Sequence, residues 1–237
     1  NPFLAEHTDA IKFYYSEECL GNNPHVAHLL RIVHDTNDAN DTFLVNPDAC
    51  TNGMLMYYMV DQKLSPNELQ SVFIKLANLI SAAHKKNIVL RNISISNVGL
   101  DSDKNPVLLS LVTSCENGDK VPIFDRSPHM CPPETVPREK GPVQEEPRIE
   151  AKFEQDIYVF GALMHMLLGG RFAPVGFSLR VGLSTHFYPV PSENLNQSMK
   201  DFIKKMMGPP DQRPTIEQVV EALTNGTALV DGADITK

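Results

Sequence analysis

Three polar side chains are spaced along a largely apolar segment in the middle of the chain. Asn92 is followed by Asn97 five residues later, and Ser110 comes thirteen residues after Asn97. Amides and hydroxyls donate and accept hydrogen bonds, but they are uncharged near neutral pH and cannot serve as general bases. Neutral oxygens are also weak ligands for magnesium when no carboxylate accompanies them. The sequence therefore predicts a polar site with little capacity for acid–base chemistry or metal binding.

The nearest carboxylates lie between Asn97 and Ser110. Asp101 and Asp103 could in principle approach the site, but their position ahead of an apolar run favours an exposed turn before a strand.

The elements that must position these side chains are clearest after residue 64. Ser65 and Glu68 form a capping box, which predicts a helix whose apolar residues recur every three or four positions to about Lys85. Three further helices are predicted over 153–168, 198–207 and 215–223. The first of these is apolar on nearly all sides, so we expect it to be buried in the core.

The N-terminal part has a different pattern, with short apolar runs separated by polar residues. These runs predict strands over 11–15, 42–45 and 53–60, and a helix near 26–33. We therefore expect an α+β fold, with a small β-rich lobe at 1–60 and a larger helical lobe at 61–237. A proline-rich insert at about 135–150 has no sustained period and predicts a surface loop.

The charge of the chain excludes some partners. Its 237 residues include 21 Lys and Arg against 29 Asp and Glu, a net charge of −8. Nucleic acids and anionic membranes bind positively charged proteins, so we expect no nucleic-acid partner. No apolar run approaches the roughly 18 residues of a membrane helix, so we expect no membrane insertion.

Five short motifs, in order, resemble those of protein kinases. Leu90-Arg91-Asn92, with Asn97, is similar to the catalytic loop H-R-D-L-x-x-x-N, and Ser110-Leu111-Val112 stands where that family has D-F-G. Pro132-Pro133-Glu134 resembles A-P-E. Two more positions match the start of the family's central helix and the arginine that pairs with the A-P-E glutamate, namely Asp156 and Arg213. The resemblance covers roughly residues 54–224 and implies a bilobal kinase-like fold.

The resemblance also implies which catalytic parts are missing. Kinases use one Asp to accept the substrate proton and another to hold magnesium, and Asn92 and Ser110 stand at those positions. No glycine-rich phosphate loop precedes Ile11. Lys12 is the candidate for the nucleotide-binding lysine, although a solvated lysine in a short strand is an equal alternative. The resemblance thus implies a pseudokinase with no cofactor.

Other matched positions have structural roles in this interpretation. We expect Glu134 and Arg213 to form a buried ion pair, and Asp156 to cap the backbone of the 90–92 turn. His84 matches a structural histidine, and Arg91 is expected to pair with an acidic residue. The two candidates for that partner are Glu116 and Asp125.

The four cysteines contain no C-x-x-C pair, which argues against a zinc site and leaves either free thiols or two disulfides. They are Cys19, Cys50, Cys115 and Cys131. The chain also carries four N-x-S/T sequons, at Asn40, Asn92, Asn196 and Asn225. Both features favour a secreted protein.

The missing glycine loop, the cysteines and the sequons together resemble the secreted rhoptry and dense-granule kinase-like proteins of apicomplexan parasites, in the branch without a glycine loop. This resemblance implies export to the parasitophorous vacuole or the cyst wall. A kinase-like lobe would bring Cys19 close to Cys50, and Cys115 and Cys131 would bracket the activation segment. The resemblance therefore implies these two disulfides, with four reduced thiols as the alternative.

Two functions are compatible with these sequence features. The first is an inactive, non-enzymatic module that binds a protein partner. The second is an unconventional and very slow ATP-dependent protein kinase.

Overall fold

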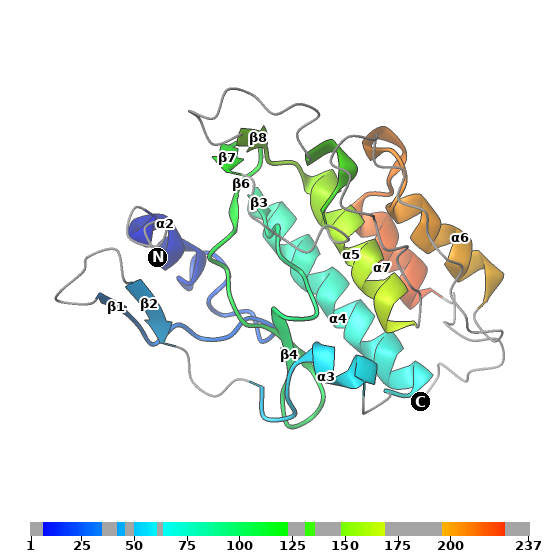
Figure 1. Cartoon of the computed structure of the whole chain (residues 1–237), viewed down its shortest axis with the longest axis horizontal. Coiled ribbons are helices and arrows are strands. Elements are labelled where there is room, and N and C mark those ends of the chain that lie inside the picture. The colour runs from blue at the N-terminus through cyan, green and yellow to red at the C-terminus, as the bar shows by residue number, and fades with distance from the viewer. Residues whose placement is uncertain are drawn as a thin grey trace.

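A computed structural model describes residues 7–34, 42–45, 50–60, 64–122, 131–135, 148–168 and 196–225. Helices and short antiparallel sheets occur together in it, as an α+β fold requires (Figure 1). Most of the proline-rich insert at about 135–150 lies outside the described residues.

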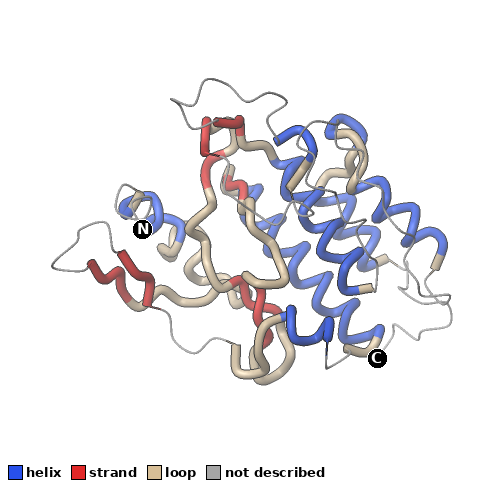
Figure 2. Tube along the Cα trace, in the orientation of Figure 1, coloured by secondary structure: helices blue, strands red, loops and turns tan. Residues whose placement is uncertain are grey.

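Four helices lie side by side on one side of the molecule (Figures 1 and 2). They are α4 (Pro66–Lys85), α5 (Phe153–Leu167), α6 (Gln197–Met206) and α7 (Ile216–Thr224). All four were predicted to within about two residues. Capping explains the agreement for α4 and α7, because Ser65 with Glu68 and Thr215 with Gln218 form complete capping boxes at their starts.

The core lies between these helices. Phe73 of α4 and Phe160 of α5 pack edge to face with ring centroids 6.3 Å apart. On the other side of α5, Gly161 allows α6 to approach closely. A Cβ atom at Gly161 would lie only 2.9 Å from the Cβ of Met206. The absence of a side chain at Gly161 therefore sets the contact between α5 and α6.

The described strands form two-stranded antiparallel sheets. The pairs are β1 (Arg31–His34) with β2 (Thr42–Val45), β3 (Ile88–Val89) with β6 (Cys115–Glu116), β4 (Val98–Leu100) with β5 (Pro106–Leu108), and β7 (Lys120–Pro122) with β8 (Arg148–Glu150). Single 3₁₀ turns cover Pro133–Thr135 and Pro210–Gln212.

The N-terminal predictions were wrong in three of four places. Residues 11–15 were expected as a strand, but 11–14 belong to the helix α2 (Thr8–Tyr14) and Tyr15 is its C-cap. Ile11 and Tyr14 are buried while Lys12 and Phe13 are exposed, which is the three-residue spacing of one helix face. Residues 53–60, also expected as a strand, contain the helix α3 (Leu55–Val60), and its buried residues Leu55 and Tyr58 have the same spacing.

Residues 26–33, expected as a helix, are extended. Val26 forms a β-bridge with Leu108, the last residue of β5. The strand β1 begins at Arg31, five residues after Val26. Only the strand predicted over 42–45 is confirmed, as β2. The described part of the first sixty residues is therefore not rich in β-structure.

Within the described ranges, no helix has both the length and the apolar composition needed to cross a membrane.

Candidate functional site

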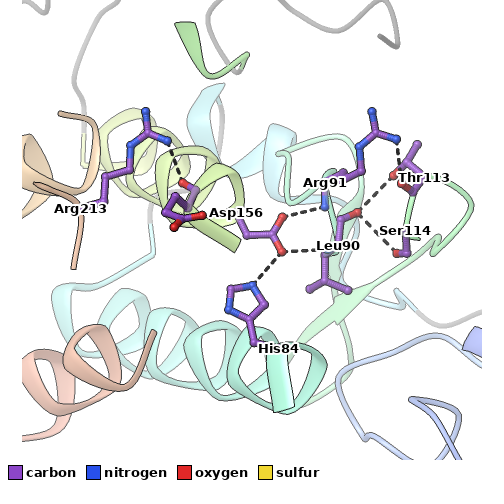
Figure 3. A network of polar contacts seen from close by, with 8 residues as sticks. His84, Leu90, Arg91, Thr113, Ser114, Asp156 and Arg213 are labelled. Carbon is purple, nitrogen blue, oxygen red and sulfur yellow. Dashed lines mark hydrogen bonds and ion pairs between the residues drawn. The ribbon is translucent and has the colours of Figure 1, made fainter. Parts of the chain in front are cut away.

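Asp156 organises the polar site from the first turns of α5. Its side chain is fully buried and accepts hydrogen bonds from the backbone N–H groups of Leu90, at 2.8 Å, and Arg91, at 2.7 Å. His84, near the end of α4, contacts the same carboxylate through Nε2 at 3.0 Å (Figure 3). The His84 ring also stacks on Phe153, with centroids 4.3 Å apart. Asp156 therefore caps the 90–92 turn, as expected, and joins it to both central helices.

The turn that Asp156 holds has an unusual backbone. Arg91 has a φ angle of 64°, in the left-handed region that side chains other than glycine rarely adopt. The backbone N–H groups of Leu90 and Arg91 both donate to the Asp156 carboxylate, and these two hydrogen bonds stabilise this conformation. The left-handed turn places the guanidinium of Arg91 inside the protein.

Two hydrogen bonds of the Arg91 side chain go to backbone carbonyl groups. Its guanidinium donates to the backbone carbonyl oxygens of Thr113, at 3.4 Å, and Pro122, at 2.8 Å. The side chain of Glu116 is exposed, and Asp125 lies outside the described residues. Burial lowers the pKa of Arg91. Arg91 thus anchors the following segment through the backbone carbonyls of Thr113 and Pro122.

Asn97 brings the three positions of the polar site together. Its side-chain amide nitrogen donates to the backbone carbonyl of Asn92 at 2.8 Å and to that of Ser110 at 2.9 Å. Asn97 is buried, whereas Asn92 and Ser110 are half-buried. Asn92, Asn97 and Ser110, which are spaced along the sequence, therefore lie together in the fold.

Ser110 makes only local contacts with its side chain. Its Oγ accepts a hydrogen bond from the backbone N–H of Val112 at 3.3 Å. The next residue, Leu111, donates its backbone N–H to the hydroxyl of Tyr15 at 2.9 Å. The segment 110–112 is therefore held by Asn97 on one side and by the N-terminal segment on the other.

Lys12 is not part of this site. It lies on α2 with its side chain 62% exposed, and its ammonium group is 3.8 Å from the carboxylate of Asp9. The short apolar run around Lys12 suggested a strand, but Ile11 and Tyr14 form the buried face of a helix instead. The strand on which the nucleotide-lysine interpretation depended does not form, and Lys12 is a solvated lysine on a helix.

Asp101 and Asp103 lie in the turn between β4 and β5. Asp101 Oδ1 accepts the backbone N–H groups of Asp103, at 2.9 Å, and Asn105, at 2.8 Å. Hydrogen bonds from Asn105 and Asp103 lower the pKa of Asp101 in spite of its partial burial, which acts in the opposite direction. The Asp101 carboxylate stabilises a hairpin turn, and both residues lie in the turn that the favoured interpretation predicted.

Glu134 and Arg213 form the expected ion pair. The two guanidinium nitrogens of Arg213 donate to the two carboxylate oxygens at 2.6 and 2.9 Å. Arg213 also donates to the carbonyl oxygens of Glu154 and Gly208, both at 2.9 Å, and lies 5.0 Å from the ring centre of Tyr158. The Arg213 side chain is 1% exposed and that of Glu134 is 29% exposed, so only the arginine is fully buried.

Neither expected disulfide forms. Cys19 lies near Lys86, just beyond the C-terminal end of α4, whereas Cys50 packs on Gly99, next to the turn that contacts the N-terminal half of that helix. Cys115 is buried against Arg91, and burial raises the pKa of its thiol to about 12. The predicted partners Cys19 and Cys50 therefore lie in different surroundings.

The chemistry available at the polar site follows from these contacts. Asn92, Asn97 and Ser110 offer neutral oxygens and amide donors, which can hydrogen-bond a ligand but cannot take up a proton near neutral pH. Among the described residues, no three His, Cys, Asp or Glu side chains are grouped so that they could hold a metal ion.

Sequence reasoning missed Tyr15 as a contributor to the site. Its hydroxyl reaches Leu111 across 96 positions, and no local pattern in the sequence announces such a contact. A comparison of the chain with models of known protein families found no match.

Proposed function

We propose that this chain is a catalytically inactive pseudokinase with a bilobal kinase-like fold, which works as a secreted module that binds a protein partner. The observation that carries the proposal is the contact of Asn97 with the backbone of Asn92 and Ser110. Kinases need the corresponding three positions to converge on one substrate. Here they converge, and none of the three bears a carboxylate.

Two further contacts support the kinase-like frame. Asp156 caps the turn at residues 90–91, and Arg213 holds Glu134 at the end of the segment that follows the site. Both contacts join residues more than sixty positions apart, and both were expected from the motif alignment. Such long-range agreement is hard to obtain from an incorrect alignment.

The charge balance of the site supports the absence of catalysis. A triphosphate with magnesium needs carboxylates for the metal and donors or cations for the phosphates. Lys12 is directed to solvent on α2, and Arg91 uses its donors on backbone carbonyls. Losses at the base, the metal ligand and the lysine act on the same transition state, so they compound.

A kinase-like fold that has lost catalysis can still bind a protein partner. The net charge of −8 favours a protein partner over nucleic acid. The sequons support passage through the secretory pathway, with the parasitophorous vacuole or the cyst wall as the destination that the family resemblance implies.

The test is a thermal-shift titration with ATP and either magnesium or manganese. We expect no saturable rise in Tm, because a ligand that does not bind the folded state cannot stabilise it. An active protein kinase measured in parallel serves as the positive control. A saturable rise of several degrees in the pseudokinase would contradict the inactive assignment and favour the slow kinase.

A further inference from the structure

The four sequons differ in how the folded chain presents them. An N-linked glycan is bulky and hydrophilic, so a folded protein accommodates it only where the asparagine side chain reaches solvent. Asn40 lies outside the described residues. The other three, Asn92, Asn196 and Asn225, can be compared directly.

Asn92 is poorly placed to carry a glycan. It is half-buried between two buried residues, Arg91 and Ile93. Its backbone N–H donates to Leu90 at 2.8 Å, and its carbonyl accepts the Asn97 amide at 2.8 Å. A sugar on this side chain would have to displace part of the polar site.

Asn196 is the N-cap residue of α6. Its Oδ1 caps α6 by accepting the backbone N–H of Ser198 at 2.8 Å.

Asn225 is presented differently, at the exposed C-terminal end of α7. Its backbone N–H bonds to Glu221 at 2.8 Å, and the hydroxyl of Thr224 donates to the carbonyl of Val220 at 2.8 Å. The helix end is thus closed by the Asn225 backbone and by the Thr224 side chain. Within the part of the chain that the structure describes, the Asn225 side chain carries no cap and no burial that a glycan would disturb.

We propose that Asn225 is the acceptor of an N-linked glycan in the secreted protein and that Asn92 is not. This inference rests on the secretory part of the proposed function. In the modification, the Asn225 amide nitrogen forms a bond to C1 of the first sugar of a lipid-linked oligosaccharide diphosphate. The bond from C1 to the diphosphate breaks, the lipid diphosphate leaves, and the amide proton passes to a base of the transferase.

Matched variants can remove each sequon without touching its asparagine. Thr227→Ala removes the hydroxyl of the Asn225 sequon, Ser94→Ala that of Asn92, and Ser198→Ala that of Asn196. Ser198→Ala keeps the α6 cap, because Ser198 contributes only its backbone N–H to that cap.

The experiment is expression of the full chain, fused to a cleavable secretion signal, in eukaryotic cells. Secreted protein is treated with the amidase that converts a glycosylated asparagine to aspartate, and each sequon peptide is then examined by mass spectrometry. We expect conversion at Asn225, loss of that conversion in Thr227→Ala alone, and none at Asn92. Secreted, folded protein that is unmodified at Asn225, or modified at Asn92, would overturn the inference.

This readout is independent of the inactive assignment, which depends on nucleotide binding. It is also independent of natural routing, because the added signal directs secretion. The native route is tested separately, by the same peptide analysis on protein from its own cells. Conversion at Asn225 there supports the inference, and an unmodified Asn225 in protein recovered from a secretory compartment overturns it.

Discussion

The hydroxyl of Tyr15 accepts a hydrogen bond from the backbone N–H of Leu111, 96 positions away in the chain. This contact fixes the N-terminal segment to the residues that follow the polar site. Leu111 is fully buried, so its N–H group has no ready substitute for this acceptor.

Replacement of Tyr15 by Phe should therefore destabilise the fold by about 1 to 3 kcal/mol, because the buried N–H of Leu111 loses its acceptor. Chemical denaturation measures the loss. Tyr57→Phe is the matched control, since Tyr57 is 52% exposed, and it should change stability by less than about 0.5 kcal/mol. Equal effects of the two changes would show that the Tyr15 hydroxyl contributes nothing.

Glu134→Gln should destabilise the fold by about 3 kcal/mol, because it leaves the buried charge of Arg213 without its carboxylate. The control is Glu150→Gln in the exposed pair with Lys152, where both side chains are 54% exposed. That change should cost less than about 1 kcal/mol. Similar losses in the two variants, measured by urea unfolding, would place the Glu134–Arg213 contact on the surface.

The stability of the fold should depend on Glu68 at acidic pH. Hydrogen bonds from Lys104 and Ser65 hold the pKa of Glu68 at about 2, below its ordinary value of 4.5. A depressed pKa means that the carboxylate stabilises the fold above pH 4.5, and that this contribution is lost as the pH falls towards 2.

Unfolding measured across that range should show a smaller acid-induced loss of stability in Glu68→Gln than in the wild type. Lys104→Gln removes the principal cause of the shift and should act in the same direction. An acid profile unchanged in both variants would contradict the assignment.

Native alkylation should distinguish the cysteines. Burial raises the pKa of Cys115 to about 12, so its reactive thiolate is scarce at neutral pH. Cys50 is only half-buried and should react much faster with iodoacetamide, as peptide mapping at timed intervals can show. After unfolding without reductant, all four thiols should alkylate. Fewer than four would restore the disulfide interpretation.

Asn92→Asp alone should produce no measurable phosphotransfer, because Ser110 still provides no carboxylate for magnesium. A radiolabelled-ATP assay checks this, with the Asn92→Asp/Ser110→Asp double variant for comparison. Activity in the single variant would mean that another carboxylate of the chain already binds the metal.

The sequence predicted the four long helices well, because caps and periodicity are local signals. The same holds for the ion pair of Glu134 with Arg213, whose positions follow from motif order. It predicted the N-terminal elements poorly. A run of five or six apolar residues suits a strand or a helix equally, and partners far away decide between them.

Val26 illustrates the difficulty. It pairs with Leu108, more than eighty residues later, and this pairing keeps the chain extended where periodicity alone suggested a helix. Arg91 is a second case, since two of its partners are the backbone carbonyls of Thr113 and Pro122. Every residue has a carbonyl, so the sequence could not identify which ones would accept.

The N-terminal residues are held by hydrogen bonds at two places, one near each end of the helix α4. Beyond its C-terminal end, Lys86 donates to the carbonyl of Glu18. Near its N-terminal end, Asn52 donates to the carbonyls of Asp101 and Ser102, in the turn whose Lys104 pairs with Glu68.

The helix α4 has twenty residues and is about 30 Å long. Movement of the N-terminal residues about one of these contacts would break the other. The described N-terminal residues around Glu18 and Asn52 are therefore restrained by contacts close to both ends of α4.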